Sequence, residues 1–168
     1  MSDKAKNLIN KEFGGKVRVR VGGILIQNEK VLLLKHEGVG PDKYLWSPPG
    51  GGLQFGQDAK ENLKREFLEE TNLKVTVDDL LFTNEYIDER LHAIELFFGV
   101  RLVSGELKLG RDPEMGKEQI LTEIAYFGVE DLKKEKKNRL HTMFHGINKP
   151  EEVLNLTGYF KFVVNSCK

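Results

Sequence analysis

The chain has 168 residues, of which 39% are hydrophobic and 31% are charged. Lys and Arg together number 26, as do Asp and Glu, so the net charge excludes the basic balance of a non-specific nucleic-acid or membrane binder. The one cysteine, Cys167, excludes an internal disulfide framework and a cysteine-rich zinc site. No apolar run approaches the roughly 20 residues of a membrane span, and we expect a soluble, cytoplasmic protein.

The length and the lack of repeats or linkers predict a single domain over residues 1–168, with residues 1–15 as a short lead-in. Three valines then alternate with Arg18 and Arg20, which is the period of a half-buried strand. Residues 24–34 are typical of a hairpin that turns at Asn28–Glu29.

Glycine and proline fill residues 38–52, which excludes a helix or a central strand there. A helix is expected to follow, with Asp58 as its N-cap and Glu61 completing a capping box. An apolar stripe recurs every fourth residue, at Ala59, Leu63 and Phe67. We expect the helix to end at Asn72, because asparagine tolerates the left-handed conformation.

Strand-like runs follow the helix, at residues 73–77, 80–87, 91–103 and 119–127. A charged helical segment is expected from Glu130, and residues 159–164 can add a strand or cover a face. Because strands outnumber helices, the order predicts an α/β (α+β) sandwich, in which helices flank a mixed sheet.

Three carboxylates, of Glu66, Glu69 and Glu70, crowd one face of the predicted helix because they are spaced i, i+3 and i+4. Glu70 also borders the apolar stripe, where an uncompensated charge is unfavourable. A hard divalent cation such as Mg²⁺ or Mn²⁺ would supply the compensation. For this segment taken alone, a solvated acidic face is the alternative interpretation.

A glycine-rich loop precedes this helix and contains Gly51 and Gly52. Such a loop offers backbone N–H groups and the positive end of the helix dipole to phosphate oxygens. A phosphate chain and its accompanying Mg²⁺ would therefore be held by adjacent parts of one loop–helix unit.

Residues 51–73 resemble the Nudix box, the signature of the Nudix hydrolase (MutT-like) family. Seven of its nine specified positions match, namely Gly51, Arg65, Glu66, Phe67, Glu69, Glu70 and Leu73. Gln57 replaces a glutamate that braces the arginine in the family, and Asn72 replaces a glycine. The resemblance implies a Nudix-type α/β/α sandwich.

The resemblance also implies Mg²⁺-dependent hydrolysis of a nucleoside diphosphate linked to another moiety, with Mn²⁺ as a substitute ion. Metal-binding and catalytic roles would fall to Glu66, Glu69 and Glu70, an orienting role to Arg65, and a backbone contact to Gly51. Members of the family often have a further acidic residue, which acts as a base or an extra metal ligand, in the loop before a late strand. Residues 123–127 resemble that strand, and Glu118 is our candidate for the acid. Glu114 and Glu123 are its rivals, and an ordinary exposed acid is the alternative.

Substrate contacts are expected from Gly51, Gly52, Arg18, Phe55 and Tyr86, the last two being among several aromatic residues suited to stacking on a base or to core packing. The partner would be a small-molecule nucleotide, and no specific nucleic acid is expected. A proline typical of many ADP-ribose hydrolases is replaced by Asp88–Arg90, which favours a nucleoside triphosphate or a nucleotide sugar. The alternative function left open is a non-catalytic nucleotide sensor, which Gln57 favours. A homodimer is a possible assembly.

Overall fold

The structure is a computed structural model, and it describes residues 14–87, 91–115 and 119–163. Most of the predicted lead-in lies outside these ranges. The strands are β1 (Val17–Gln27), β2 (Lys30–Glu37), β3 (Tyr44–Ser47), β4 (Gly50–Gly52), β5 (Lys74–Ile87), β6 (His92–Ser104), β7 (Leu121–Phe127) and β8 (Gly158–Val163). The helices are α2 (Ala59–Thr71) and α3 (Val129–Lys134), with 3₁₀ turns at Pro113–Met115, Lys137–Arg139, Thr142–Phe144 and Pro150–Asn155.

The strands form one mixed sheet in the order β3-β2-β1-β6-β5-β8, with β4 paired to β1 and β7 paired to β2. β1 runs parallel to β6, and β8 runs parallel to β5. The pairs β1–β2, β2–β3, β2–β7, β1–β4 and β5–β6 are antiparallel. The predicted mixed sheet is confirmed.

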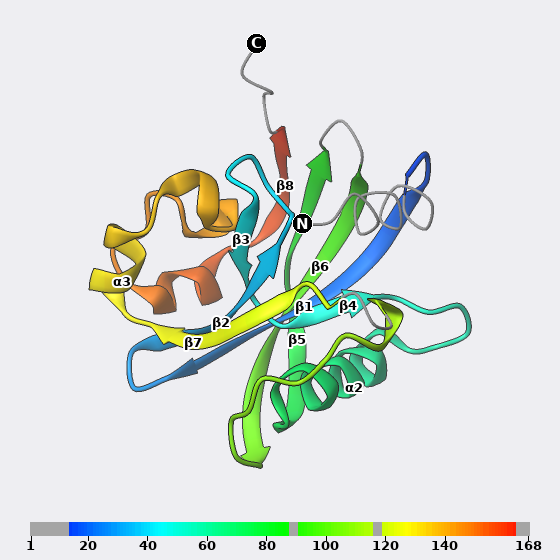
Figure 1. The fold of residues 1–168 in the computed structure, drawn as a ribbon. Helices are drawn as coiled ribbons and strands as arrows, with labels where there is room; N and C mark the ends of the chain where they lie inside the picture. Colours follow the sequence, from blue (N-terminus) through cyan, green and yellow to red (C-terminus); the bar gives the residue numbers. More distant parts are fainter. Residues whose placement is uncertain (1–13, 88–90, 116–118, 164–168) are drawn as a thin grey trace.

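Helices cover both faces of the sheet (Figure 1), which confirms the predicted sandwich. On one face, Leu63 and Phe67 of α2 pack in a core cluster with buried residues of β1, β2, β5 and β6. On the other face, Leu132 of α3 and residues of the 3₁₀ turns pack in a second cluster. The apolar stripe read from the sequence is therefore the face that α2 buries against the sheet.

A two-residue turn joins β1 and β2, as the sequence predicts. Asn28 and Glu29 have φ of 50° and 60°, and Ile26 pairs with Val31 across the turn. Two positive φ values match the right-handed twist of the flanking strands.

Two glycines inside β1 allow the core to close on both faces. A Cβ atom at Gly22 would lie 2.5 Å from the Phe97 ring, and one at Gly23 would lie 2.4 Å from the Phe67 ring. The aromatic rings therefore occupy the space that side chains would fill, and the strand continues through this point without interruption.

Three local features differ in detail from the sequence prediction. β5 is one strand instead of two, with register shifts between Val77 and Phe82 that accommodate the two intervening aspartates. Residues 38–52 contain β3, at an edge of the sheet, and the three-residue β4, with Pro48 and Pro49 between them. The charged segment forms only the six-residue α3 before it becomes irregular. No helix in the described residues is long and apolar enough to span a membrane.

Candidate active site

The ends of α2 are fixed by the residues that the sequence indicates. The Asp58 side chain accepts hydrogen bonds from the N–H groups of Lys60 and Glu61, and Asn72 takes the left-handed conformation with φ of 60°. The predicted capping box is not formed, because the Glu61 carboxylate contacts Lys64 at 2.6 Å and does not accept from the Asp58 N–H. Asn72 thus takes, at the position of the family's glycine, the left-handed conformation that ends a helix.

Two carboxylates of α2 lie against the backbone of β4. The Gly50 N–H donates to Glu70 Oε2 at 2.9 Å, and both Glu66 and Glu70 are 2% exposed. A Cβ atom at Gly51 would lie 2.5 Å from the Cδ atom of Glu66. Glycine at position 51 is therefore required for the Glu66 carboxylate to sit where it does.

Arg65 connects the acidic side chains. Its guanidinium donates to Glu66 Oε1 at 2.6 Å, to Glu69 Oε2 at 2.7 Å and to Asn62 Oδ1 at 3.1 Å. The buried Asn62 amide donates in turn to the Gly52 carbonyl at 3.1 Å. Gln57 is exposed, so the amide that braces Arg65 is that of Asn62, which the sequence analysis did not identify.

Burial raises the pKa of Glu70 well above its usual range, and the nearby carboxylates of Glu66 and Asp112 raise it further. The Gly50 N–H and the charge of Arg20 oppose this shift without cancelling it. An additional positive charge beside Glu70 would relieve the cost of ionising it.

These oxygen donors have the chemistry that Mg²⁺ or Mn²⁺ prefers. In the described part of the chain, however, no three acidic, histidine or cysteine side chains converge as they stand on a common metal position. Arg65 binds one oxygen of each of Glu66 and Glu69. The donor set, and the burial that raises the pKa of Glu70, fit a divalent ion that these carboxylates would hold.

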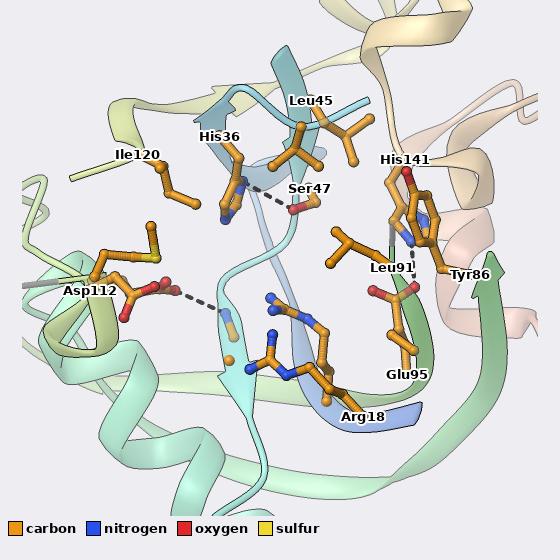
Figure 2. A pocket seen from close by; sticks show the side chains of 17 residues that line it. Arg18, His36, Leu45, Ser47, Tyr86, Leu91, Glu95, Asp112, Ile120 and His141 are labelled. Carbon is orange, nitrogen blue, oxygen red and sulfur yellow. Dashed lines mark hydrogen bonds and ion pairs between the residues drawn. The ribbon is translucent and has the colours of Figure 1, made fainter. Parts of the chain in front are cut away.

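A hollow of about 930 Å³, including the solvent at its mouth, opens beside Glu70 (Figure 2). Gly51, Arg18 and Tyr86, which the sequence analysis selects for substrate contacts, all line it. Gly52 is buried behind the lining, and Phe55 is fully exposed outside it.

Strand register explains how the hollow is built. Across β1, β6 and β5, Arg18, Ala93 and Tyr86 form one row. Directly opposed residues of neighbouring strands share a face of the sheet, so this row lies together on the wall of the hollow. The next such row consists of Arg20, Glu95 and Asn84.

Further lining residues come from distant segments: Arg20, His36, Glu95, Asp112 and His141. Burial lowers the pKa of His36 to about 4, so this ring is neutral at pH 7. Only the alternation that puts Arg18 and Arg20 on one face of β1 was visible in the sequence. The other side chains meet through pairing and turns that no local pattern specifies.

The further acid predicted before the late strand has an additional candidate. Glu118 and the side chain of Glu114 lie outside the described residues. Glu123 contacts Lys35 at 2.7 Å and does not line the hollow. Asp112 does line it, and its backbone is clamped by Gln119, whose amide accepts from the Asp112 N–H at 2.8 Å and donates to its carbonyl at 3.0 Å.

Comparison with known proteins places this geometry in a family. A family model of the NUDIX domain matches residues 16–145. A relative from Methanocaldococcus jannaschii, named ADP-ribose pyrophosphatase, is 33% identical over 118 residues, or 69% of this chain and 64% of the relative. This chain belongs to the NUDIX domain family. It spans less than two thirds of the length of that relative.

Solved structures share the NUDIX fold. An ADP-ribose pyrophosphatase from Streptococcus suis matches with a TM-score of 0.58 and 20% identity, over 85% of this chain and 98% of that one. A MutT protein from Methanosarcina mazei matches with a TM-score of 0.59 and 20% identity, over 75% of this chain and 86% of that one. NUDIX hydrolases generally use a divalent metal ion and act on small-molecule nucleotides.

Proposed function

We propose that this NUDIX protein hydrolyses the pyrophosphate bond of a nucleoside diphosphate linked to another moiety, with Mg²⁺ as the ion and Mn²⁺ as a substitute. The observation that carries the proposal is the placement of the buried Glu66 and Glu70 carboxylates against the glycine backbone of β4. Glu70 also lines the hollow, together with Arg18 and Arg20.

The acidic residues of α2 and Arg65 have distinct roles in this proposal. Glu66, Glu69 and Glu70 would hold the ion, with the Gly51 backbone beside them, and Arg65 would orient Glu66 and Glu69 through its hydrogen bonds. Glu118 stays our candidate for the further acid that binds the ion, with Glu114 as its rival. Asp112, which lines the hollow, joins them as a candidate, and Glu123 does not line the hollow. When bound, a divalent ion neutralises phosphate charge and activates water near neutral pH.

The arginines of β1 suit the phosphate chain. Arg18 and Arg20 both line the hollow from alternate positions of β1, which pairs with β4 on one side and with β6, the strand of Glu95, on the other. A guanidinium pairs well with phosphate oxygens, because its N–H groups form charge-assisted hydrogen bonds. Arg18, Gly51, Gly52 and Tyr86 remain proposed substrate contacts, and Phe55 remains one only if the loop reaches the ligand.

Two observations bear on which compound of this class is the substrate. The sequence favours a nucleoside triphosphate or a nucleotide sugar, and the name of the Methanocaldococcus relative adds ADP-ribose, itself a nucleoside diphosphate joined to a sugar. The sensor alternative rests on Gln57, which is exposed, whereas the amide that braces Arg65 is that of Asn62, and hydrolysis is therefore the function that we favour. A cytoplasmic location and a homodimer stay predictions.

The test is a substrate panel. The protein is incubated with Mg²⁺ or Mn²⁺ and nucleoside triphosphates, ADP-ribose, other nucleotide sugars, dinucleotides or capped RNA, and the products are separated by anion-exchange chromatography. We expect ion-dependent release of a nucleotide product from at least one compound. Glu70→Gln should lower turnover by at least about 100-fold without loss of the folded state. Thermal stabilisation by a nucleotide without any product would contradict hydrolysis and favour the sensor.

A further inference from the structure

At one end of the hollow lies the carboxylate of Glu95, which has no role in the reaction proposed above. Figure 2 shows Asp112 on one side of the hollow and Glu95, His141 and Tyr86 on the other, with Arg18 between them. Glu95 lies on β6, opposite Arg20 on one neighbouring strand and Asn84 on the other. The Glu95 side chain is only 14% exposed, so its orientation is set by its protein contacts.

Two donors fix the Glu95 carboxylate through the same oxygen. Asn84 Nδ2 donates to Oε2 at 2.6 Å, and His141 Nε2 contacts Oε2 at 3.0 Å. His141 Nδ1 accepts from the Met143 N–H at 3.3 Å, so Nε2 is the ring nitrogen that carries a proton toward Glu95. The ring also packs edge-on against Phe97, at 5.2 Å between centroids.

The charge state of Glu95 follows from these neighbours. Burial acts to raise the pKa of Glu95, but its interactions with His141, Arg20 and Asn84 outweigh burial and hold that pKa below its usual range. The group is therefore an ionised acceptor at neutral pH. A carboxylate oxygen accepts about two hydrogen bonds, so Oε2 is filled. Oε1 accepts no side-chain hydrogen bond from the described residues, so it is the oxygen left for a ligand.

The surroundings of Glu95 select the kind of ligand. Figure 2 shows its carboxylate facing the hollow, and the nearby walls are largely apolar, with Leu45, Leu91, Ala93 and Tyr86 among them. A flat, mostly apolar group with one hydrogen-bond donor fits such walls, as a nucleobase with an amino group does.

We propose, on the basis of the function proposed above, that Glu95 determines base specificity by accepting a hydrogen bond from an amino group of the substrate's nucleobase. His141 and Asn84 are positioning residues that hold the carboxylate. The phosphate chain would then extend past Arg18 and Arg20 toward Glu70.

The variant Glu95→Gln gives a sharp test, because the same two donors dictate how the new amide turns. Asn84 Nδ2 and His141 Nε2 would hold the amide oxygen where Oε2 was, which directs the amide NH₂ group into the hollow. An acceptor is thus replaced by a donor at the same position, with almost no change of shape. A base that presents an oxo group would then fit better than one that presents an amino group.

The matched control is Glu85→Gln. Glu85 is also 14% exposed and contacts a histidine, His92, at 2.8 Å. It pairs with Ile94, the neighbour of Glu95, and therefore lies on the opposite face of the same sheet, away from the hollow. Glu85→Gln therefore shows whether the loss of a similarly buried carboxylate from this sheet changes the kinetic constants when the hollow itself is unchanged.

The experiment measures kcat/KM for matched substrates that differ in one amino group, built on the compound that the panel identifies. Three comparisons are made. Adenine is compared with hypoxanthine and cytosine with uracil, where an oxo group replaces the amino group, and guanine is compared with hypoxanthine, where a hydrogen atom replaces it. In at least one pair, wild type and Glu85→Gln should prefer the amino-bearing base by about 10-fold or more, as expected for a hydrogen bond to a charged group. Glu95→Gln should abolish or invert that preference.

A second measurement does not depend on catalysis. The Kd values of AMP, GMP, CMP, IMP and UMP for wild type and both variants, measured by calorimetry, should show the same pattern. The proposal is overturned if wild type shows no amino preference, or if Glu95→Gln retains it while its unfolding transition matches wild type. If no compound is hydrolysed but the Kd pattern holds, the hydrolase proposal fails and the base-specificity proposal stands.

Discussion

Glu70 combines full burial with only one hydrogen-bond donor, the Gly50 N–H, among the contacts described above. Its raised pKa means that the folded protein binds this proton more tightly than the unfolded chain, whose glutamate pKa is about 4.3. Stability contributed by the protonated group is therefore present below that value and is lost as pH rises through the folded pKa.

The first prediction concerns the metal-free protein. In EDTA, Glu70→Gln should unfold at a higher temperature than wild type at pH 8, because the amide keeps the Gly50 hydrogen bond without a buried charge. The difference should shrink as pH falls toward 4, and thermal unfolding followed by circular dichroism measures it. Equal unfolding temperatures at pH 8, or a difference that grows at low pH, would be inconsistent with a costly buried charge.

The second prediction concerns the glycine that accommodates Glu66. Gly51→Ala should lower kcat by at least about 10-fold, because its methyl group displaces the Glu66 carboxylate and small displacements in an active site have large effects. Gly99→Ala is the matched control, since its Cβ atom would come no closer than 3.9 Å to Asp78. Similar kinetic constants for the two variants would refute a role for the glycine at position 51.

At this scale the sequence predicted the acidic cluster well and the hollow poorly. Glu66, Glu70 and Arg65 lie on one helix, so their mutual placement follows from helical spacing alone. Asn62 was missed, although it is on the same helix, because an asparagine near a helix start is more often a solvent-exposed residue than a brace. Glu95 and His141 could not be paired, since 46 positions separate them along the chain.

The helix α2 is the element on which the site depends, and a loop closes its C-terminal end. Three backbone N–H groups, of Lys108, Gly110 and Arg111, donate to the carbonyls of Thr71, Glu70 and Glu69 at 2.8–3.1 Å. These carbonyls have no partner within the helix, so the loop satisfies them in the manner of a cap. The same loop leads directly to Asp112 at the hollow.

The third prediction tests this loop. A Cβ atom at Gly110 would lie 1.8 Å from the Glu69 carbonyl oxygen, so Gly110→Ala must displace the loop. We expect a loss of about 1–3 kcal/mol in the free energy of unfolding and a lower kcat, since Asp112 shifts with the loop. Urea denaturation and the panel assay measure the two effects. Lys108→Ala, which keeps its backbone N–H, should change neither, and a destabilisation equal to that of Gly110→Ala would contradict the account.

Features of the secondary structure that depend on local chemistry were predicted, and those that depend on pairing between strands were not. Both ends of α2 follow from Asp58 and Asn72, because capping is local chemistry. The continuity of β5 past Asp78 was not predicted, since consecutive aspartates are typical of turns. Val77 and Leu80, on either side of the two aspartates, pair with Val100 and Phe98 of β6, and a register shift accommodates the aspartates within the strand.

At the scale of the whole molecule, the site exists because β1 brings distant segments into one sheet. It pairs with β4 on one side and with β6 on the other, so that Arg20 lies opposite both Gly52 and Glu95. The sequence predicted a mixed sheet between helices but not this strand order, because hydrophobic periodicity identifies strands without identifying their partners. The hollow is a consequence of that order.

The most direct test of the central claim is to locate a divalent ion by anomalous diffraction. Crystals of the wild-type protein, grown with Mn²⁺ and a slowly hydrolysed nucleotide analogue, should give an anomalous peak about 2.0–2.3 Å from carboxylate oxygens of Glu66 and Glu70. The peak should be absent from crystals of Glu70→Gln grown in the same way. A nucleotide bound in the hollow of the wild-type protein, with no ion beside those two carboxylates, would contradict the account.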